Sequence, residues 1–203
     1  MIIACLDLEG VLLPEIWIKV AEKTGIEELK LTTRDISNYD ELMLHRLKIL
    51  DQHKIDINKI SEVISTISPL DGAPEFLAKL RERYQIIILS DTFYQFAQPL
   101  MKKLGNPTLF CHQLVVNETG KIAGYKLRMQ DQKREAVLRF RELKFKTIAT
   151  GDSYNDINML KTADRGVFFC PPERVIKEFP EIPVVYDYDA LYNAFTKAEM
   201  EIS

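Results

Sequence analysis

The sequence of 203 residues predicts an α/β fold, in which a three-layer parallel sheet core carries a helical cap inserted after the first strand. Short, continuous apolar runs alternate with helix-like patterns, which is typical of a parallel sheet covered by helices on both faces. A long stretch after the first run has helical patterns and no convincing strand, which is more than one crossover helix needs. Together these patterns predict a Rossmann-like core interrupted by a subdomain.

The predicted elements of the core follow in chain order. Apolar, β-rich runs predict strands over Ile2–Leu6, Gln85–Leu89, Lys146–Thr150 and Gly166–Phe169. Helical patterns predict helices over Thr92–Leu104, Gln132–Leu143, Asn155–Thr162 and Glu173–Phe179. One departure from the alternation is Leu114–Leu127, which predicts a hairpin that turns at Asn117–Gly120.

The predicted cap covers residues 14–68, and residues 1–13 and 69–203 form the predicted core. The stretch Pro69–Pro74 is rich in turn-forming residues and predicts the loop that returns to the core. Within the cap, Tyr39–His53 projects as a helix with an apolar arc. Arg46 falls in the middle of that arc, so it needs an anionic partner, which is either an acid of this chain or a ligand.

Composition limits the classes of function. The net charge of -3 gives no basic surface for nucleic acid. No apolar run approaches the roughly 20 residues that span a bilayer, so we expect no membrane partner either. Cys5 and Cys170 lie in apolar runs and are expected to be small buried hydrophobes. The odd cysteine count and the lack of a signal peptide indicate a cytoplasmic protein.

Polar and charged residues follow three of the predicted strands. These residues are Asp7, Glu9, Ser90, Asp91, Asp152, Asn155 and Asp156, and Lys133 opens the helix before the third of these strands. In an open parallel sheet, ligands bind outside the carboxyl ends of the strands. Carboxylate oxygens suit Mg²⁺, which also takes substrate phosphate, and a lysine offsets charge on phosphoryl oxygens. The pattern therefore predicts a magnesium-dependent phosphate site.

Each of these residues also has a plainer explanation when taken alone. Ser153 and Asp156 are spaced like a helix capping box, and Asp91 or Thr92 could cap the following helix. Lys133 could be one solvated charge among its charged neighbours. Asp7 has no capping role, however, and all the groups fall at one edge of the sheet, which favours chemistry over structure.

The same residues carry a resemblance to a known family. Asp7-Leu8-Glu9-Gly10-Val11 resembles the first motif of the haloacid dehalogenase superfamily, which is normally Asp-x-Asp-x-Thr/Val. Ser90, Lys133 and the string Gly151–Asp156 resemble its second, third and fourth motifs in the right order. Within the superfamily, the chain is most similar to the phosphoserine phosphatase/homoserine phosphotransferase subgroup, over nearly its full length.

This resemblance implies roles for the residues at the motif positions. Asp7 would be the nucleophile that forms an aspartyl-phosphate, and Glu9 would act as general acid and then as general base. Mg²⁺ would be held by Asp7, the backbone carbonyl of Glu9 and Asp152, with Asp156 as a nearby carboxylate. Ser90 and Lys133 would hold the phosphoryl oxygens, and Asp91 is counted among the substrate-binding residues with its role left open.

The resemblance also implies a small phosphorylated amino acid as the substrate. Arg46 would clamp its α-carboxylate, Glu15 would face its ammonium group, and Asn155 would reach it from the core. Taken by itself, Glu15 after Pro14 is an ordinary helix N-terminus. None of the histidines has metal-ligand spacing, and they are assigned no role.

Two departures from the family pattern leave the reaction's acceptor open. Glu9 stands where aspartate is commoner, and Asp91-Thr92 follow Ser90 where many relatives have glycines. Water and homoserine are therefore both candidate acceptors. A phosphatase for another small metabolite and a receiver-like module phosphorylated on aspartate are the alternative hypotheses. Many relatives are dimers, so a homodimer is one state to test.

Overall fold

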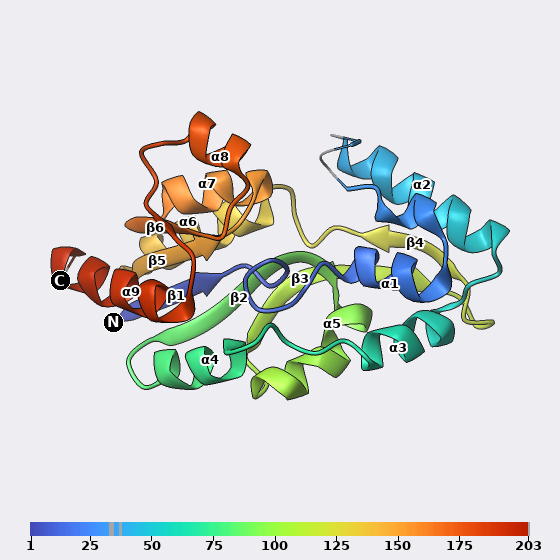
Figure 1. Ribbon diagram of the computed structural model, residues 1–203, viewed down its shortest axis with the longest axis horizontal. Helices are drawn as coiled ribbons and strands as arrows, with labels where there is room; N and C mark the ends of the chain where they lie inside the picture. The colour runs from blue at the N-terminus through green and yellow to red at the C-terminus, as the bar shows by residue number, and fades with distance from the viewer. Residues whose placement is uncertain (33–34, 37, 203) are drawn as a thin grey trace.

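A computed structural model describes residues 1–32, 35–36 and 38–202. Its strands are β1 Ile2–Leu6, β2 Gln85–Phe93, β3 Thr108–Val116, β4 Ile122–Lys126, β5 Lys146–Gly151, β6 Arg165–Phe169 and β7 Val184–Val185. Its α-helices are α1 Ile16–Thr24, α2 Tyr39–Gln52, α3 Ile57–Ser65, α4 Ala73–Arg81, α5 Tyr94–Met101, α6 Gln132–Glu142, α7 Ile157–Thr162, α8 Glu173–Glu178 and α9 Tyr188–Ile202 (Figure 1). Short 3₁₀ helices are η1 Glu27–Lys30, η2 Lys102–Leu104 and η3 Tyr154–Asp156.

The strands form one sheet in the order β4-β3-β2-β1-β5-β6-β7. Adjacent strands are parallel except β3 and β4, which form the predicted hairpin. The first strand therefore lies between β2 and β5, and the carboxyl ends of these three strands meet at one edge. This arrangement confirms the predicted α/β class and explains why the polar residues after the three strands come together.

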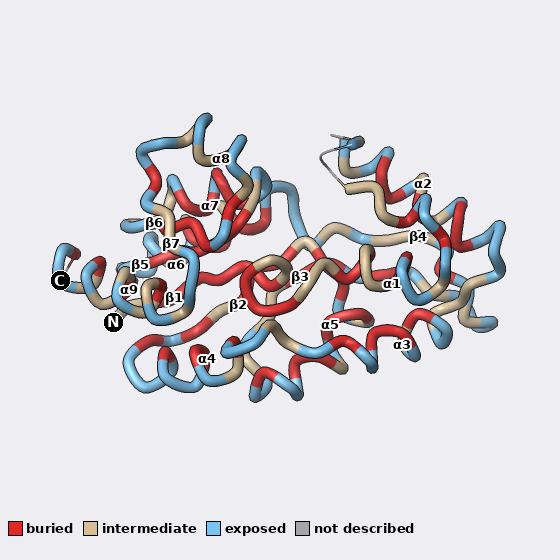
Figure 2. Tube along the Cα trace, in the orientation of Figure 1, coloured by how far each residue is buried: buried red, intermediate tan, exposed pale blue. Residues whose placement is uncertain are grey.

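Alternation along β1 shows how the sheet is covered on both faces. Ala4 and Leu6 belong to an apolar cluster that includes α4, α5 and α9. Ile3 and Cys5 belong to a second cluster, formed with α6, α7 and α8. Because strand side chains alternate between faces, a fully apolar strand requires a helical layer on each side. Figure 2 shows the buried trace running through the middle of the molecule between these layers.

The inserted segment begins directly after the first strand and its loop. Helices α1, α2 and α3 lie together at the opposite end of the molecule from the two chain termini (Figure 1). The backbone N–H of Leu70 donates to the carbonyl of Leu12 at 3.0 Å, so the chain leaves and returns to the core at adjacent points. The apolar cluster of the core continues into these helices. The division into cap and core at residues 14–68 stays a prediction.

The second strand is longer than predicted, and this changes what two of its residues do. β2 continues to Phe93, which pairs with His112 of β3 after a register shift. Helix α5 begins only at Tyr94, and its N-cap position is Phe93. The prediction that Asp91 or Thr92 caps the helix is therefore wrong, because both residues still belong to the extended strand and Phe93 takes the N-cap position.

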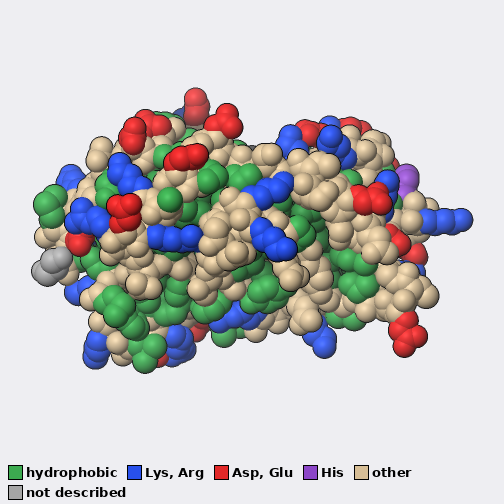
Figure 3. All heavy atoms as spheres, turned by 90° about the horizontal axis from the view of Figure 1, so that it is seen from below, with side chains coloured by type: hydrophobic (Ala, Val, Ile, Leu, Met, Phe, Trp, Pro, Cys, Tyr) green, Lys and Arg blue, Asp and Glu red, His purple; other side chains and the backbone are tan. Residues whose placement is uncertain are grey.

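Cys170 also differs from its expected environment. It follows β6, has a φ of 48° and is exposed, so it is not the buried hydrophobe that its apolar run predicted. Cys5 and Cys111 are buried. In the described ranges no helix has the length and apolarity to cross a bilayer. Figure 3 shows charged side chains of both signs scattered over the face that carries α4 and α5.

Candidate active site

Three carboxylates meet at the carboxyl edge of the sheet. Asp7 follows β1, Asp152 follows β5, and Asp156 ends the 3₁₀ helix η3. One oxygen from each lies within 4.8 Å of the other two, and the three residues are at most 8% exposed. Buried carboxylates this close need cationic partners.

Lys133 supplies the positive charge for this cluster. It lies in the first turn of α6 and is 2% exposed. Its Nζ is 2.9 Å from Asp7 Oδ1, 2.8 Å from Asp156 Oδ1 and 3.9 Å from Asp91 Oδ2. Burial lowers the pKa of Lys133, but the three carboxylates raise it well above its ordinary value. The side chain is therefore a fixed ammonium inside the site, not the solvated charge that composition alone allowed.

Asp156 has two structural tasks at once. Its Oδ2 accepts hydrogen bonds from the backbone N–H groups of Asp152 and Ser153 at 3.0 and 3.1 Å, which caps η3. Its other oxygen faces Lys133. The capping explanation therefore holds, and the same cap fixes the carboxylate against the lysine.

Two glycines of the motifs leave room for these carboxylates. Gly10 has a φ of +78°, and a Cβ built on it would lie 2.4 Å from Asp152 Cγ. A Cβ on Gly151 would lie 2.2 Å from Asp156 Cγ. At both positions a larger residue would occupy the space of a site carboxylate. Gly10 also needs the left-handed backbone that glycine adopts without strain.

Asp7 is held in one orientation. The backbone N–H of Leu8 donates to its Oδ1 at 2.7 Å, and Lys133 contacts the same oxygen. Burial raises the pKa of Asp7 well above its ordinary value; Asp156 and Asp152 raise it further, while Lys133 lowers it. A cation placed among the carboxylates would reverse this shift.

Glu9 lies beyond the end of β1, so strand alternation does not fix its direction. Its Oε2 accepts the backbone N–H of Ile16, the first residue of α1, at 2.8 Å. Burial and the charge of Glu15 raise the pKa of Glu9 to about 8, although the bond from Ile16, Arg46 and a hydrogen bond with Thr92 lower it. Glu9 thus lies where the loop after β1 meets α1, and its carboxyl group holds its proton near neutral pH.

The second motif brings Ser90 and Asp91 to the same edge. Ser90 is 2% exposed, and its Oγ accepts the N–H of Thr92 at 3.2 Å. Burial raises the pKa of Asp91, but Lys133 and hydrogen bonds from His112, Asn155 and Gln132 hold it well below its usual range. Asp91 is therefore an anion with several partners.

Arg46 and Glu15 come from the inserted segment. Arg46 is 7% exposed, its guanidinium stacks 4.6 Å from the Trp17 ring centroid, and Nη2 donates to Leu31 O at 2.9 Å. Its buried Nε has no partner among the described residues. Burial lowers the pKa of Arg46 to about 10, while the charges of Glu9 and Glu15 raise it. Both residues thus lie in the electrostatic neighbourhood of Glu9.

The acidic cluster fits the expected magnesium ion. Asp7, Asp152 and Asp156 offer hard carboxylate oxygens, which is the donor chemistry that Mg²⁺ prefers. Gly10 keeps the space beside Asp152 open. Three carboxylates against one lysine also leave excess negative charge that a divalent cation would offset.

An open parallel sheet with buried carboxylates and an ammonium at its carboxyl edge defines an α/β enzyme with a cation-compatible anion site. The chain belongs to the haloacid dehalogenase-like hydrolases, whose family model matches residues 3–164. It is 58% identical to a phosphoserine phosphatase of Pseudomonas syringae pv. tomato, over 97% of this chain and 83% of that protein. It is 57% identical to the phosphoserine phosphatase ThrH of Pseudomonas aeruginosa, over 98% of this chain and 97% of that protein.

The fold also resembles solved structures. A phosphoserine phosphatase in its apo form superposes with a TM-score of 0.74 and 26% identity, over 90% of this chain and 92% of that one. The family, the fold and the enzyme class inferred from the motif residues are therefore confirmed. The role of each site residue stays a prediction.

Sequence reasoning missed the residues that support the site. His112 was assigned no role because it has no metal-ligand spacing, yet it is 4% exposed and lies beside Asp91. Gln132 directly precedes Lys133 and donates to Ser90 O. Gln132 could have been suspected from that position. His112 could not, because only the pairing of β2 with β3 brings it to the edge.

Proposed function

We propose that the chain is a Mg²⁺-dependent phosphatase that removes the phosphoryl group of phosphoserine through an aspartyl-phosphate on Asp7. The observation that carries this proposal is the fixed Asp7 carboxylate, whose Oδ1 receives both Leu8 N–H and Lys133. This arrangement leaves Oδ2 as the oxygen for attack. The two Pseudomonas relatives that carry the name phosphoserine phosphatase support the substrate.

The proposed reaction has two steps. Asp7 attacks phosphorus, the bond from phosphorus to the serine oxygen breaks, and Glu9 gives its proton to the leaving oxygen. A water then gives a proton to Glu9 and attacks phosphorus, which breaks the bond to Asp7 and releases phosphate. Lys133 and Ser90 hold the phosphoryl oxygens throughout. Mg²⁺, held by Asp7, Asp152 and the backbone carbonyl of Glu9, would offset charge on the phosphoryl group.

Two residues of the inserted segment would recognise the amino acid part of the substrate. Arg46 has a buried Nε without a partner among the described residues, so its guanidinium has capacity for a carboxylate. Glu15 adds a negative charge near Glu9 and Arg46, where a substrate ammonium would offset it. This pair gives one counter-charge to each end of a free amino acid.

Homoserine is the second acceptor that we propose to test. Its hydroxyl would replace water in the second step and yield phosphohomoserine. We also propose a cytoplasmic location, in keeping with three free thiols, and a homodimer as the assembly to test.

Phosphorus NMR of phosphoserine with Mg²⁺, with and without homoserine, tests the reaction. Inorganic phosphate is expected in both samples, and phosphohomoserine in the second only if transfer occurs. Asp7→Asn should be inactive, and a folded Asp7→Asn variant with full activity would contradict the proposal.

Arg46→Lys tests the substrate. It keeps a positive charge but loses the planar fork, so kcat/KM for phosphoserine should fall at least about tenfold. Turnover of p-nitrophenyl phosphate, which has no amino acid groups, should stay near that of the wild type. Equal losses on both compounds would argue against phosphoserine as the substrate.

A further inference from the structure

Asp91 is the residue on which several elements converge. Its Oδ1 accepts a hydrogen bond from Gln132 Nε2 at 3.2 Å and lies 3.5 Å from His112 Nε2. Its Oδ2 accepts a hydrogen bond from Asn155 Nδ2 at 3.1 Å. The hydroxyl of Tyr39, from the first turn of α2, donates to its backbone carbonyl at 3.0 Å. Both carboxylate oxygens are thus engaged by the protein, which leaves little capacity for a substrate.

His112 directs its Nε2 toward Asp91. Its Nδ1 accepts the backbone N–H of Arg128 at 3.1 Å, so the ring proton lies on Nε2, the nitrogen that faces Asp91. The imidazole is 4% exposed and packs against the rings of Tyr39 and Phe93. This environment allows His112 little freedom to turn away.

Hydrogen bonds at both Oδ1 and Nδ2 orient the side-chain amide of Asn155. Its Oδ1 accepts a hydrogen bond from Ser153 Oγ, and one Nδ2 hydrogen is given to Asp91. The second Nδ2 hydrogen donates to no described residue, and Asn155 is exposed. The position of Lys133 depends much less on Asp91, because its Nζ is 3.9 Å from Asp91 but within 2.9 Å of its other carboxylate partners.

We propose that Asp91 and His112 are positioning residues that turn the Asn155 amide toward the substrate phosphoryl group. His112 Nε2–H holds one oxygen of Asp91, and the other oxygen of Asp91 holds the amide with its free hydrogen directed into the site. This inference deepens the proposed function and rests on it. Asp91 then acts through Asn155 and not by direct contact with the substrate.

A double-mutant cycle on phosphoserine turnover tests the coupling. Asp91→Ala and Asn155→Ala should each raise KM about tenfold, the equivalent of one hydrogen bond to a charged group. The double variant should have the KM of Asn155→Ala alone, because Asp91 then has no amide to hold. The proposal would be overturned if adding Asp91→Ala to the Asn155→Ala variant raised KM by a further tenfold.

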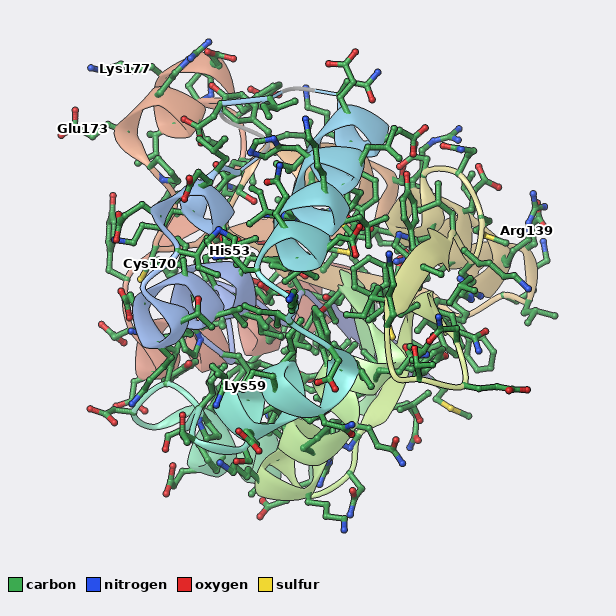
Figure 4. All side chains as sticks on the ribbon, turned by 90° about the vertical axis from the view of Figure 1, so that its right-hand side faces the viewer. His53, Lys59, Arg139, Cys170, Glu173 and Lys177 are labelled. Atoms are coloured by element: carbon green, nitrogen blue, oxygen red, sulfur yellow. The ribbon has the colours of Figure 1, made fainter. Side chains whose placement is uncertain are left out.

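His112 is tested by a pair of variants and a control. His112→Gln keeps a donor for Asp91 and an acceptor for Arg128 N–H, so its KM should stay within about twofold of the wild type, whereas His112→Phe should match Asp91→Ala. His53→Gln is the control, since His53 lies exposed at the end of α2 (Figure 4). Equal KM for the Gln and Phe variants of His112 would overturn its role.

The side-chain amide resonances of Asn155 give a readout that needs no turnover. In the wild type, one Nδ2 hydrogen should be shifted downfield and protected from exchange, and both effects should disappear in Asp91→Ala and His112→Phe and return in His112→Gln. Unchanged resonances in Asp91→Ala would overturn the proposal. A wild type that shows the bonded amide but does not hydrolyse phosphoserine would contradict only the proposed function.

Discussion

Lys133 Nζ lies 2.8 Å from Asp156 Oδ1, and neither side chain is more than 3% exposed. Removing one partner of such a pair leaves an uncompensated buried charge, whereas an exposed pair contributes little. The lysine therefore holds the folded site together before any substrate arrives.

Lys133→Met should lower the free energy of unfolding of the metal-free protein by about 3–5 kcal/mol. Urea denaturation in the presence of EDTA measures this loss. The control is Lys161→Met, which breaks an exposed pair with Glu181 and should cost less than about 1 kcal/mol. Similar small losses in both variants would show that the cluster does not depend on its lysine.

Binding of Mg²⁺ to Asp7, Asp152 and the backbone carbonyl of Glu9 should stabilise the fold. At about 100 times the dissociation constant, a ligand that binds only the folded state adds about 2.7 kcal/mol. Thermal unfolding should show this increase in the wild type and in Asp189→Asn, which alters an exposed acid. Asp152→Asn should lose it, and a full Mg²⁺ shift in Asp152→Asn would remove Asp152 from the ligand set.

Gly10→Ala should abolish Mg²⁺ binding and reduce activity at least about 100-fold, because the new Cβ would fall on the Asp152 carboxylate. Gly25→Ala is the matched control. Gly25 has a similar φ of +72°, but nothing lies within 4 Å of its built Cβ. It should cost about 1 kcal/mol of stability from backbone strain and leave activity intact. Isothermal calorimetry with Mg²⁺ and a turnover assay measure both effects, and Mg²⁺ binding retained by Gly10→Ala would contradict the close packing.

Glu9 should make the metal-free protein less stable at alkaline pH. Its pKa rises from 4.5 to about 8 on folding, mainly through burial and then through Glu15. Because folding raises the pKa of Glu9, its contribution to the free energy of unfolding is fully present below pH 4.5. This contribution is lost as the pH rises through 8.

Glu9→Gln should therefore be more stable than the wild type at pH 9 by roughly 1–3 kcal/mol and similar to it at pH 5. Urea denaturation with EDTA at the two pH values measures the difference. Glu118→Gln, which changes an exposed acid, should show no such dependence. If the free energy of unfolding depends on pH in the same way for Glu9→Gln and the wild type, Glu9 is not the group with the raised pKa.

The core was largely predictable because its strands are apolar on both faces. A continuous run such as Ile2–Leu6 fits only a strand covered on both sides, and the acids after it mark the carboxyl edge. The end of β2 was not predictable from local pattern. Asp91 and Thr92 have good capping side chains, but pairing of Phe93 with His112 keeps the chain extended past them.

In the candidate site, too, some residues could be predicted from the sequence and others could not. Asp7, Lys133 and Asp152 come from three segments whose order along a parallel sheet brings them together, so the motifs were sufficient to find them. The motifs were not sufficient to find the partners of Asp91, because His112 comes from β3, whose position next to β2 depends on tertiary pairing. The lack of a partner for Arg46 Nε within the described part of the chain could be found only from packing, since the sequence left the partner of Arg46 open.

The hydrogen bond from Leu70 N–H to the Leu12 carbonyl has a consequence for how such enzymes diversify. This bond joins the two ends of the predicted 14–68 insertion at the core, so the length of chain between them does not affect the placement of Asp7. Loop-closure entropy grows only slowly with length. A longer or shorter cap could therefore be exchanged at this junction, provided that it offers an apolar face to the core, and the recognition of substrates could change while the chemistry stays in place.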